Sequence, residues 1–115
     1  FCDKDCPFES ADLDWNDGYA FTAPVGSYPS GSSPFGLLDM AGNAWEMVQD
    51  WYDENYYSQS PVKNPQGPTT GTRRVLRGGS WGNGEGPLRT SFRYWYDPEN
   101  AFPFYGFRCS HSLTE

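Results

Sequence analysis

Phe35 to Tyr52 reads FGLLDMAGNAWEMVQDWY, and this stretch decides the fold. Within it, Ala44, Val48 and Trp51 fall at i, i+4 and i+7, which is the spacing of one buried helical face. This periodicity predicts a helix in which Asn43 is the N-cap and Glu46, at N3, bonds back to the N–H of the cap. We therefore expect a short helix at the centre of the chain.

The same stretch carries two acids that admit a second interpretation. The carboxylates of Asp39 and Glu46, with the loop carbonyls between them, would form an oxygen-rich concavity suited to a hard cation. Calcium takes six to eight such oxygens, and backbone carbonyls commonly serve. Helix capping and cation binding both remain open from the spacing alone, because this segment is not an EF-hand loop.

Length and composition set the scale of the domain. At 115 residues the chain has room for a single modest core. Its 13 glycines and 10 prolines would suit a disordered chain, but 18% of its residues are aromatic, including five Trp. That share is more than disordered chains carry. We therefore predict one domain over residues 1–115, with little regular structure and long, well-packed loops.

Charge and hydropathy exclude two kinds of partner. A net charge of −7 disfavours nucleic acid, because phosphate neutralisation needs clustered Lys and Arg. No apolar run approaches the roughly 20 residues needed to cross a bilayer, so membrane insertion is not expected.

The cysteines and the single histidine offer little chemistry. Cys2 and Cys6 are candidates for a disulfide, which would imply an oxidising compartment; a thiol pair for metal or redox chemistry is the alternative. Two cysteines alone are a weak zinc signal. His111 lies in the C-terminal tail, so a Ser/His/Asp or Cys/His catalytic arrangement has little to draw on.

Three later segments predict strands. RRVLRGGSW is apolar at Val75 and Leu76 and ends at Gly78-Gly79, a pair that suggests a bulge or a close backbone approach. LRTSFRYWY alternates with a period of two, and GFRCS reads as a short closing strand. One helix followed by an antiparallel meander of short strands gives the fold class α+β.

These segments resemble a known family. The quoted central stretch, then NPQGP, RVLRGGSW, LRTSFR and GFRCS, occur in the order seen in the formylglycine-generating enzyme family, also called sulfatase-modifying factor domains. The resemblance covers about residues 17 to 109 and implies that family's variant of the C-type lectin fold, which is poor in regular structure. Because the family domain is longer than this chain, the chain resembles its C-terminal half, and the missing N-terminal half is an expected partner.

The resemblance also implies two structural calcium sites. The first would use two side chains and two backbone carbonyls of the central stretch, namely Asp39 and Glu46, and Gly42 and Ala44. The second matches WNDGY, with the Asp17 carboxylate and the Tyr19 carbonyl. Calcium and the cysteine pair together favour an extracellular, periplasmic or cell-surface location.

The chemistry of the family's enzymes is not expected here. They oxidise a substrate cysteine to formylglycine with copper held by two cysteines, which lie between the GGS motif and the arginine-rich strand. In this chain that interval reads WGNGEGPLRTSF and contains no cysteine. Thiolate is the soft ligand that selects Cu(I). We therefore expect no copper, and a non-catalytic, calcium-stabilised binding or accessory domain.

A surface rich in aromatic side chains is the candidate ligand site, since such clusters are enriched in binding sites. The ligand would be a protein or a small molecule, and the residues expected to contact it are Trp81, Asn83, Phe92, Tyr94, Tyr96 and Phe104. The alternative is that most of these rings pack into the core. Variable proteins of diversity-generating retroelements share the fold and diversify this region, so a displayed, ligand-binding variable surface is a special case.

A second resemblance supports an enzyme. RTSFRYWYDP and YGFR are also similar to the C-terminal domain of the iron-dependent sulfoxide synthases of ergothioneine synthesis. That similarity implies a substrate-binding domain in which Arg89, Arg93 or Tyr94 touches substrate. In the structural alternative, the arginines pair with acids such as Asp50 or Asp97. An atypical sulfatase-modifying oxidoreductase is a further alternative.

Overall fold

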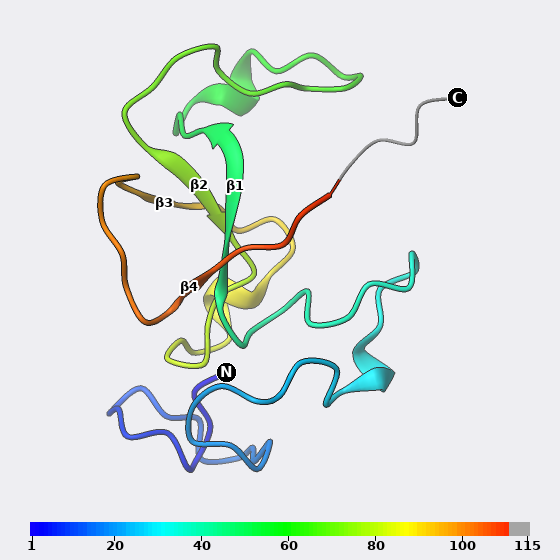
Figure 1. Cartoon of the computed structure of the whole chain (residues 1–115), viewed down its shortest axis with the longest axis vertical. Coiled ribbons are helices and arrows are strands. Elements are labelled where there is room, and N and C mark those ends of the chain that lie inside the picture. Colours follow the sequence, from blue (N-terminus) through cyan, green and yellow to red (C-terminus); the bar gives the residue numbers. More distant parts are fainter. Residues whose placement is uncertain (111–115) are drawn as a thin grey trace.

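The computed structural model describes residues 1–110, so His111 lies outside the described residues. One four-stranded sheet supplies most of the regular structure (Figure 1). Its strands are β1 (Trp45–Trp51), β2 (Arg74–Arg77), β3 (Tyr94–Tyr96) and β4 (Tyr105–Gly106). Three short 3-10 helices lie in the loops: η1 (Pro29–Gly31), η2 (Tyr56–Ser58) and η3 (Gly86–Leu88).

The predicted central helix is wrong, because Trp45–Trp51 forms strand β1. Asn43 cannot serve as its N-cap, since its φ is 64° and its side chain hydrogen-bonds both the N–H and the C=O of Ala23. Trp and Val favour a pleated, half-buried surface, and partners on both sides override the helical spacing. β1 is an inner strand that pairs with β2 through Met47↔Leu76 and with β4 through Glu46↔Gly106.

The strand order is β3-β2-β1-β4, which is only partly the predicted meander. The β1–β2 and β2–β3 pairs are antiparallel, but β4 runs parallel to β1. Residues 97–104 therefore carry the chain from the β3 edge across to the opposite edge of the sheet. Figure 1 shows this connection as the orange segment leading to β4.

The later strands are shorter than predicted. Arg74–Arg77 is a strand as expected, and the close approach after it is confirmed: a Cβ on Gly79 would lie 2.7 Å from Leu88. Of LRTSFRYWY only Tyr94–Tyr96 is a strand, because Leu88 ends η3 and the chain then turns, with the Phe92 N–H donating to the Arg89 carbonyl at 2.9 Å. The predicted strand in GFRCS is wrong beyond Gly106, and Phe107 is 76% exposed.

The core is small and lies where the sheet meets the N-terminal segment. Trp45, Val75 and Leu76 are its buried apolar residues in the sheet, and Cys2 and Cys6, which form a disulfide, are its buried apolar residues in the N-terminal loops. Figure 1 shows the first forty residues, blue to cyan, as loops at one end of the sheet.

Asp3 ties this N-terminal segment together. Its buried carboxylate accepts hydrogen bonds from the backbone N–H groups of Asp5 and Asp17. The Asp17 N–H in particular holds the pKa of Asp3 below its ordinary value. Among residues 1–110 there is no helix long and apolar enough to span a membrane.

Candidate functional site

Two concave regions contain the first expected calcium site and part of the expected ligand-contact surface. The first, here called the acidic hollow, has a volume of about 600 Å³. All four expected ligands of the first calcium site line it: Asp39, Gly42, Ala44 and Glu46. The strand that replaced the predicted helix therefore still brings these residues to one place.

The turn that precedes β1 builds the acidic hollow. Asp39, Gly42 and Asn43 all have positive φ, at 56°, 84° and 64°, which is backbone that Gly tolerates freely and Asp and Asn tolerate better than most residues. The Gly42 N–H donates to the Gly78 carbonyl at 2.8 Å and so fixes the turn against the end of β2. The DMAGNAWE sequence thus coils the chain tightly before it enters the sheet.

Each carboxylate in the acidic hollow has one oxygen held by the protein. Oδ2 of Asp39 accepts the Gly26 N–H at 2.8 Å, and Oε1 of Glu46 accepts Nε of Arg108 at 2.6 Å. The second oxygen of each has no hydrogen-bond partner among residues 1–110. Glu46 therefore pairs with Arg108 rather than with a helix cap.

The oxygen donors that line the acidic hollow are of the kind that suits a hard cation. Two carboxylates and neighbouring backbone carbonyls are the oxygen ligands that calcium prefers. Within residues 1–110 no three His, Cys, Asp or Glu side chains converge, so Asp39 and Glu46 would be the acidic ligands and carbonyls or water would complete the shell. Soft metals such as Cu(I) find no thiolate here.

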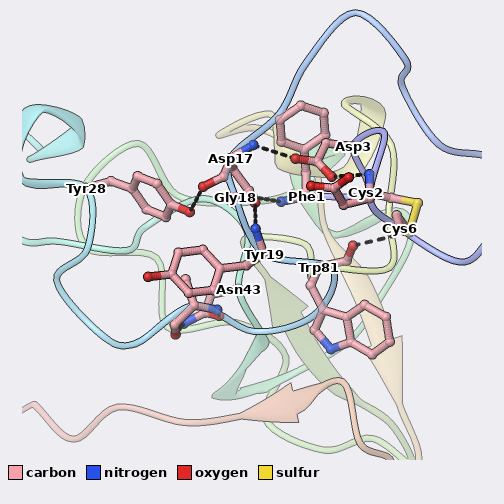
Figure 2. Close-up of polar contacts among 12 residues, drawn as sticks. Phe1, Cys2, Asp3, Cys6, Asp17, Gly18, Tyr19, Tyr28, Asn43 and Trp81 are labelled. Atoms are coloured by element: carbon pink, nitrogen blue, oxygen red, sulfur yellow. Dashed lines mark hydrogen bonds and ion pairs between the residues drawn. A yellow bond between two sulfur atoms is a disulfide. The ribbon is translucent and has the colours of Figure 1, made fainter.

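The second expected calcium site lies beside the N-terminal loops, where Figure 2 shows its residues. Oδ1 of Asp17 accepts the Tyr19 N–H at 2.9 Å, and Oδ2 lies 3.6 Å from the amino group of Phe1. The Tyr28 hydroxyl donates to the Asp17 carbonyl at 3.0 Å. Both carboxylate oxygens thus have protein partners, which makes this site poorer in free oxygens than the acidic hollow.

The second concave region, here called the aromatic hollow, has a volume of about 390 Å³. Three of the six expected ligand-contact residues line it, namely Asn83, Tyr94 and Phe104. Four further rings complete its wall: Phe8, Trp45, Phe102 and Tyr105. Tyr105 lies at one of the alternate positions expected for a displayed variable surface, whereas sequence reasoning missed the other three.

The remaining three predicted residues lie outside the aromatic hollow and contact rings of its wall. Trp81 packs against Phe104, with ring centroids 5.0 Å apart, and Phe92 lies 6.1 Å from Trp45. Tyr96 meets Tyr105 edge to face at 5.7 Å. These contacts agree with the packing alternative, and ligand contact by the three residues stays a prediction.

The polar groups of the aromatic hollow are uncharged. Oδ1 of Asn83 accepts both the N–H and the hydroxyl of Ser80, which fixes the Asn83 side chain. Its NH₂ group has no hydrogen-bond acceptor within residues 1–110 and can donate to a ligand. Burial raises the pKa of Tyr105, and the nearby Tyr94 adds to the shift. Tyr105 therefore keeps its proton at neutral pH. Apolar walls with a few fixed polar groups are typical of small-ligand sites.

The arginines proposed for substrate contact are engaged elsewhere. Arg93 lies over the Tyr57 ring at 4.0 Å and donates to the Asp53 carbonyl at 3.2 Å. Arg89 donates to the Gly86 carbonyl at 2.9 Å. Neither forms an ion pair with Asp50 or Asp97 among the described residues, so the expected pairing is wrong; aromatic stacking and carbonyls hold the guanidinium groups instead.

A loop-rich sheet with an oxygen-lined turn before its central strand places the chain in the C-type-lectin-like class of α+β domains. The chain belongs to the sulfatase-modifying factor enzyme 1-like domain family, whose model matches residues 4–113. The match and the shared fold confirm the resemblance drawn from the sequence motifs.

Curated relatives carry this domain within longer proteins. Serine/threonine-protein kinase pkn1 of Chlamydia caviae is 45% identical over 94 residues, 80% of this chain and 15% of the relative. Formylglycine-generating enzyme of Streptomyces coelicolor is 42% identical over 99 residues, 83% of this chain and 31% of the relative. Hercynine oxygenase of Mycolicibacterium smegmatis is 40% identical over 92 residues, 75% of this chain and 22% of the relative. The chain spans less than a third of each relative's length.

Two solved structures share the fold. PvdO from Pseudomonas aeruginosa superposes with a TM-score of 0.67 and 32% identity, covering 80% of this chain and 34% of that one. Treponema denticola variable protein 1 gives a TM-score of 0.61 and 29% identity, covering 80% and 32%.

Proposed function

We propose that this chain is a non-catalytic, calcium-stabilised binding domain that presents the aromatic hollow to a protein or small-molecule ligand. The observation that carries the proposal is the sequence between Gly79 and Arg93, which keeps the family's scaffold motifs on both sides but contains no cysteine. Copper chemistry of the formylglycine type needs thiolate ligands in this interval, so the scaffold is retained for binding.

The calcium part of the proposal rests on the acidic hollow. Asp39 and Glu46 each keep one carboxylate oxygen without a protein partner among residues 1–110, and both line the same hollow as Gly42 and Ala44. A cation there would join the turn before β1 to the strand itself. Calcium would thus stabilise a domain with a small core.

The ligand part of the proposal rests on the aromatic hollow. Aromatic rings supply large contact area at a low cost in side-chain entropy, and the Asn83 amide can orient a polar group of the ligand. Similarity to Treponema denticola variable protein 1 supports display of a variable surface as a special case. A near-identical template repeat in the neighbouring DNA would identify this chain as such a protein, and a neighbourhood without one would remove the special case.

An aldehyde assay tests the non-catalytic part. The purified chain is loaded with copper and incubated with a peptide containing CxPxR, with the Streptomyces coelicolor relative as the positive control. Mass spectrometry should find formylglycine in the control and none with this chain. Formylglycine above the enzyme-free background would overturn the proposal.

Variants of the hollow test the ligand part. Peptides selected from a random phage library on the native protein should lose binding to Tyr94→Ala, because Tyr94 is 45% exposed and lines the aromatic hollow. Val62→Ala is the matched surface control, since Val62 is fully exposed and lies in the loop before β2. Selected peptides that bind both variants equally would place the ligand surface elsewhere.

A second candidate function follows from the likeness to hercynine oxygenase. The chain would then be the substrate-binding part of an iron-dependent enzyme. Tyr94 lines the aromatic hollow as this function requires, but Arg89 and Arg93 are held by backbone carbonyls. A histidine-rich helical segment upstream in the full-length gene would favour this enzyme, and its absence would remove the candidate.

A further inference from the structure

Arg108 joins the two segments that carry the acids of the acidic hollow. It lies two positions after Gly106, the last residue of β4, and its Nε donates to Oε1 of Glu46 at 2.6 Å. Its two terminal nitrogens donate to the carbonyls of Leu38, at 2.9 Å, and Asp39, at 3.2 Å. The guanidinium thereby links the loop at 38–39 to strand β1. Arg108 itself is more than sixty positions from both of them in the chain.

This arrangement suits an arginine better than any other cation. The guanidinium is planar and its five N–H donors point in fixed directions, whereas a lysine ammonium is a flexible point charge. The three acceptors around Arg108 are one carboxylate and two carbonyls on different segments, so one rigid group spans all of them. An ion pair with the Glu46 carboxylate adds to the hydrogen bond.

The consequence for Glu46 is a fixed carboxylate. Arg108 holds Oε1, while Oε2 has no hydrogen-bond partner among residues 1–110. Asp39 is held in the same way, by the Gly26 N–H on Oδ2, and its own carbonyl is fixed by Arg108. Carboxylates that bind metals are commonly oriented by such outer partners, whose removal weakens binding by about 10- to 100-fold.

We propose that Arg108 is the positioning residue of the calcium site, holding Glu46 and the Asp39 loop so that their free oxygens meet one ion. The assignment rests on the proposed calcium function. The effect of Arg108 on calcium affinity could go either way, since Arg108 also places a positive charge beside the site. A purely electrostatic influence predicts tighter calcium binding when Arg108 is neutralised, whereas positioning predicts weaker binding.

Calcium titration of Arg108→Gln separates these two effects. Isothermal titration should show a dissociation constant about 10-fold or more above that of the native protein. Arg108→Lys keeps the charge but not the planar fork, so it should recover only part of the loss. Lys63→Gln removes the same charge from an exposed loop residue and should leave the constant unchanged.

Terbium luminescence supplies a readout that a general loss of stability would not move. Tb³⁺ replaces calcium, and its lifetimes in H₂O and D₂O report the number of water molecules on the bound ion. When Glu46 is no longer held, water takes its place, and Arg108→Gln should gain about one water ligand. Melting in chelator would show whether the variant is folded under the titration conditions.

The outcomes are distinguishable. Native protein that binds neither Ca²⁺ nor Tb³⁺ would overturn the calcium site and with it the role of Arg108. Native protein that binds both ions, with Arg108→Gln binding equally well at the same water number, would overturn the role of Arg108 alone. Tighter binding by Arg108→Gln would show that the guanidinium opposes the ion, which also contradicts positioning.

Discussion

Replacing Trp81 by Ala tests whether this residue supports the aromatic hollow or only contacts its ligand. The Trp81 ring packs against three others: Phe8 at 5.7 Å, Phe21 at 4.9 Å and Phe104 at 5.0 Å. Each aromatic pair contributes about 0.5–1.5 kcal/mol beyond burial, and truncating a buried Trp costs about 3–5 kcal/mol. Since Trp81 is only half-buried, we expect a loss near the lower limit, about 3 kcal/mol.

Urea unfolding followed by far-UV circular dichroism measures this loss. Trp15→Ala is the matched control, because Trp15 is 63% exposed and its carbonyl, which the substitution keeps, is the group that accepts the Lys4 N–H. The control should change the free energy of unfolding by less than about 1 kcal/mol. If Trp81→Ala is no less stable than Trp15→Ala, Trp81 is not part of the scaffold, and the original expectation that it contacts ligand regains support.

Two further predictions concern the N-terminal segment. Reducing the Cys2–Cys6 disulfide, or replacing both cysteines by Ser, should lower the free energy of unfolding by about 2 kcal/mol, which is the chain-entropy value for so short a loop. Thermal melting with and without reductant measures this loss. An unchanged melting midpoint would show that the disulfide adds no stability. Asp3→Asn should remove a pH-dependent part of the stability. Because the folded-state pKa of Asp3 lies below its ordinary value of 3.8, its contribution is present above that value and is lost as pH falls through the folded pKa. The difference between native protein and Asp3→Asn in urea titrations should therefore shrink below about pH 4, and a difference that is constant with pH would contradict this role.

Ordered motifs allowed the family to be predicted more reliably than the local structure. The succession from DMAGNAWE to GFR identified the C-type-lectin-like fold, and the pair Gly78-Gly79 correctly indicated a close backbone approach. The helical spacing of Ala44, Val48 and Trp51 predicts a helix where the structure has strand β1, Trp45–Trp51. The partners that make it a strand, β2 and β4, lie up to about sixty residues away and leave no local signal.

The candidate sites likewise contain residues that the sequence predicts and residues that it does not. The acidic hollow was predictable because its expected ligands are close in sequence, between Asp39 and Glu46. The contact between Arg108 and Glu46 was not predictable, because Arg108, which follows β4, reaches Glu46 only through the parallel pairing of β1 and β4. The aromatic hollow was predicted in part for a related reason: alternation identifies Tyr94, but Phe8 reaches the wall through the folding of the N-terminal loops.

Thermal melting in calcium and in chelator tests the central claim most directly. A ligand at about 100 times its dissociation constant stabilises the folded state by about 2.7 kcal/mol, which for a domain of this size raises the melting temperature by roughly 10 °C or more. We expect that rise for the native protein, and we expect Asp39→Asn combined with Glu46→Gln to abolish it. Equal melting temperatures of the native protein in saturating calcium and in chelator would contradict the account.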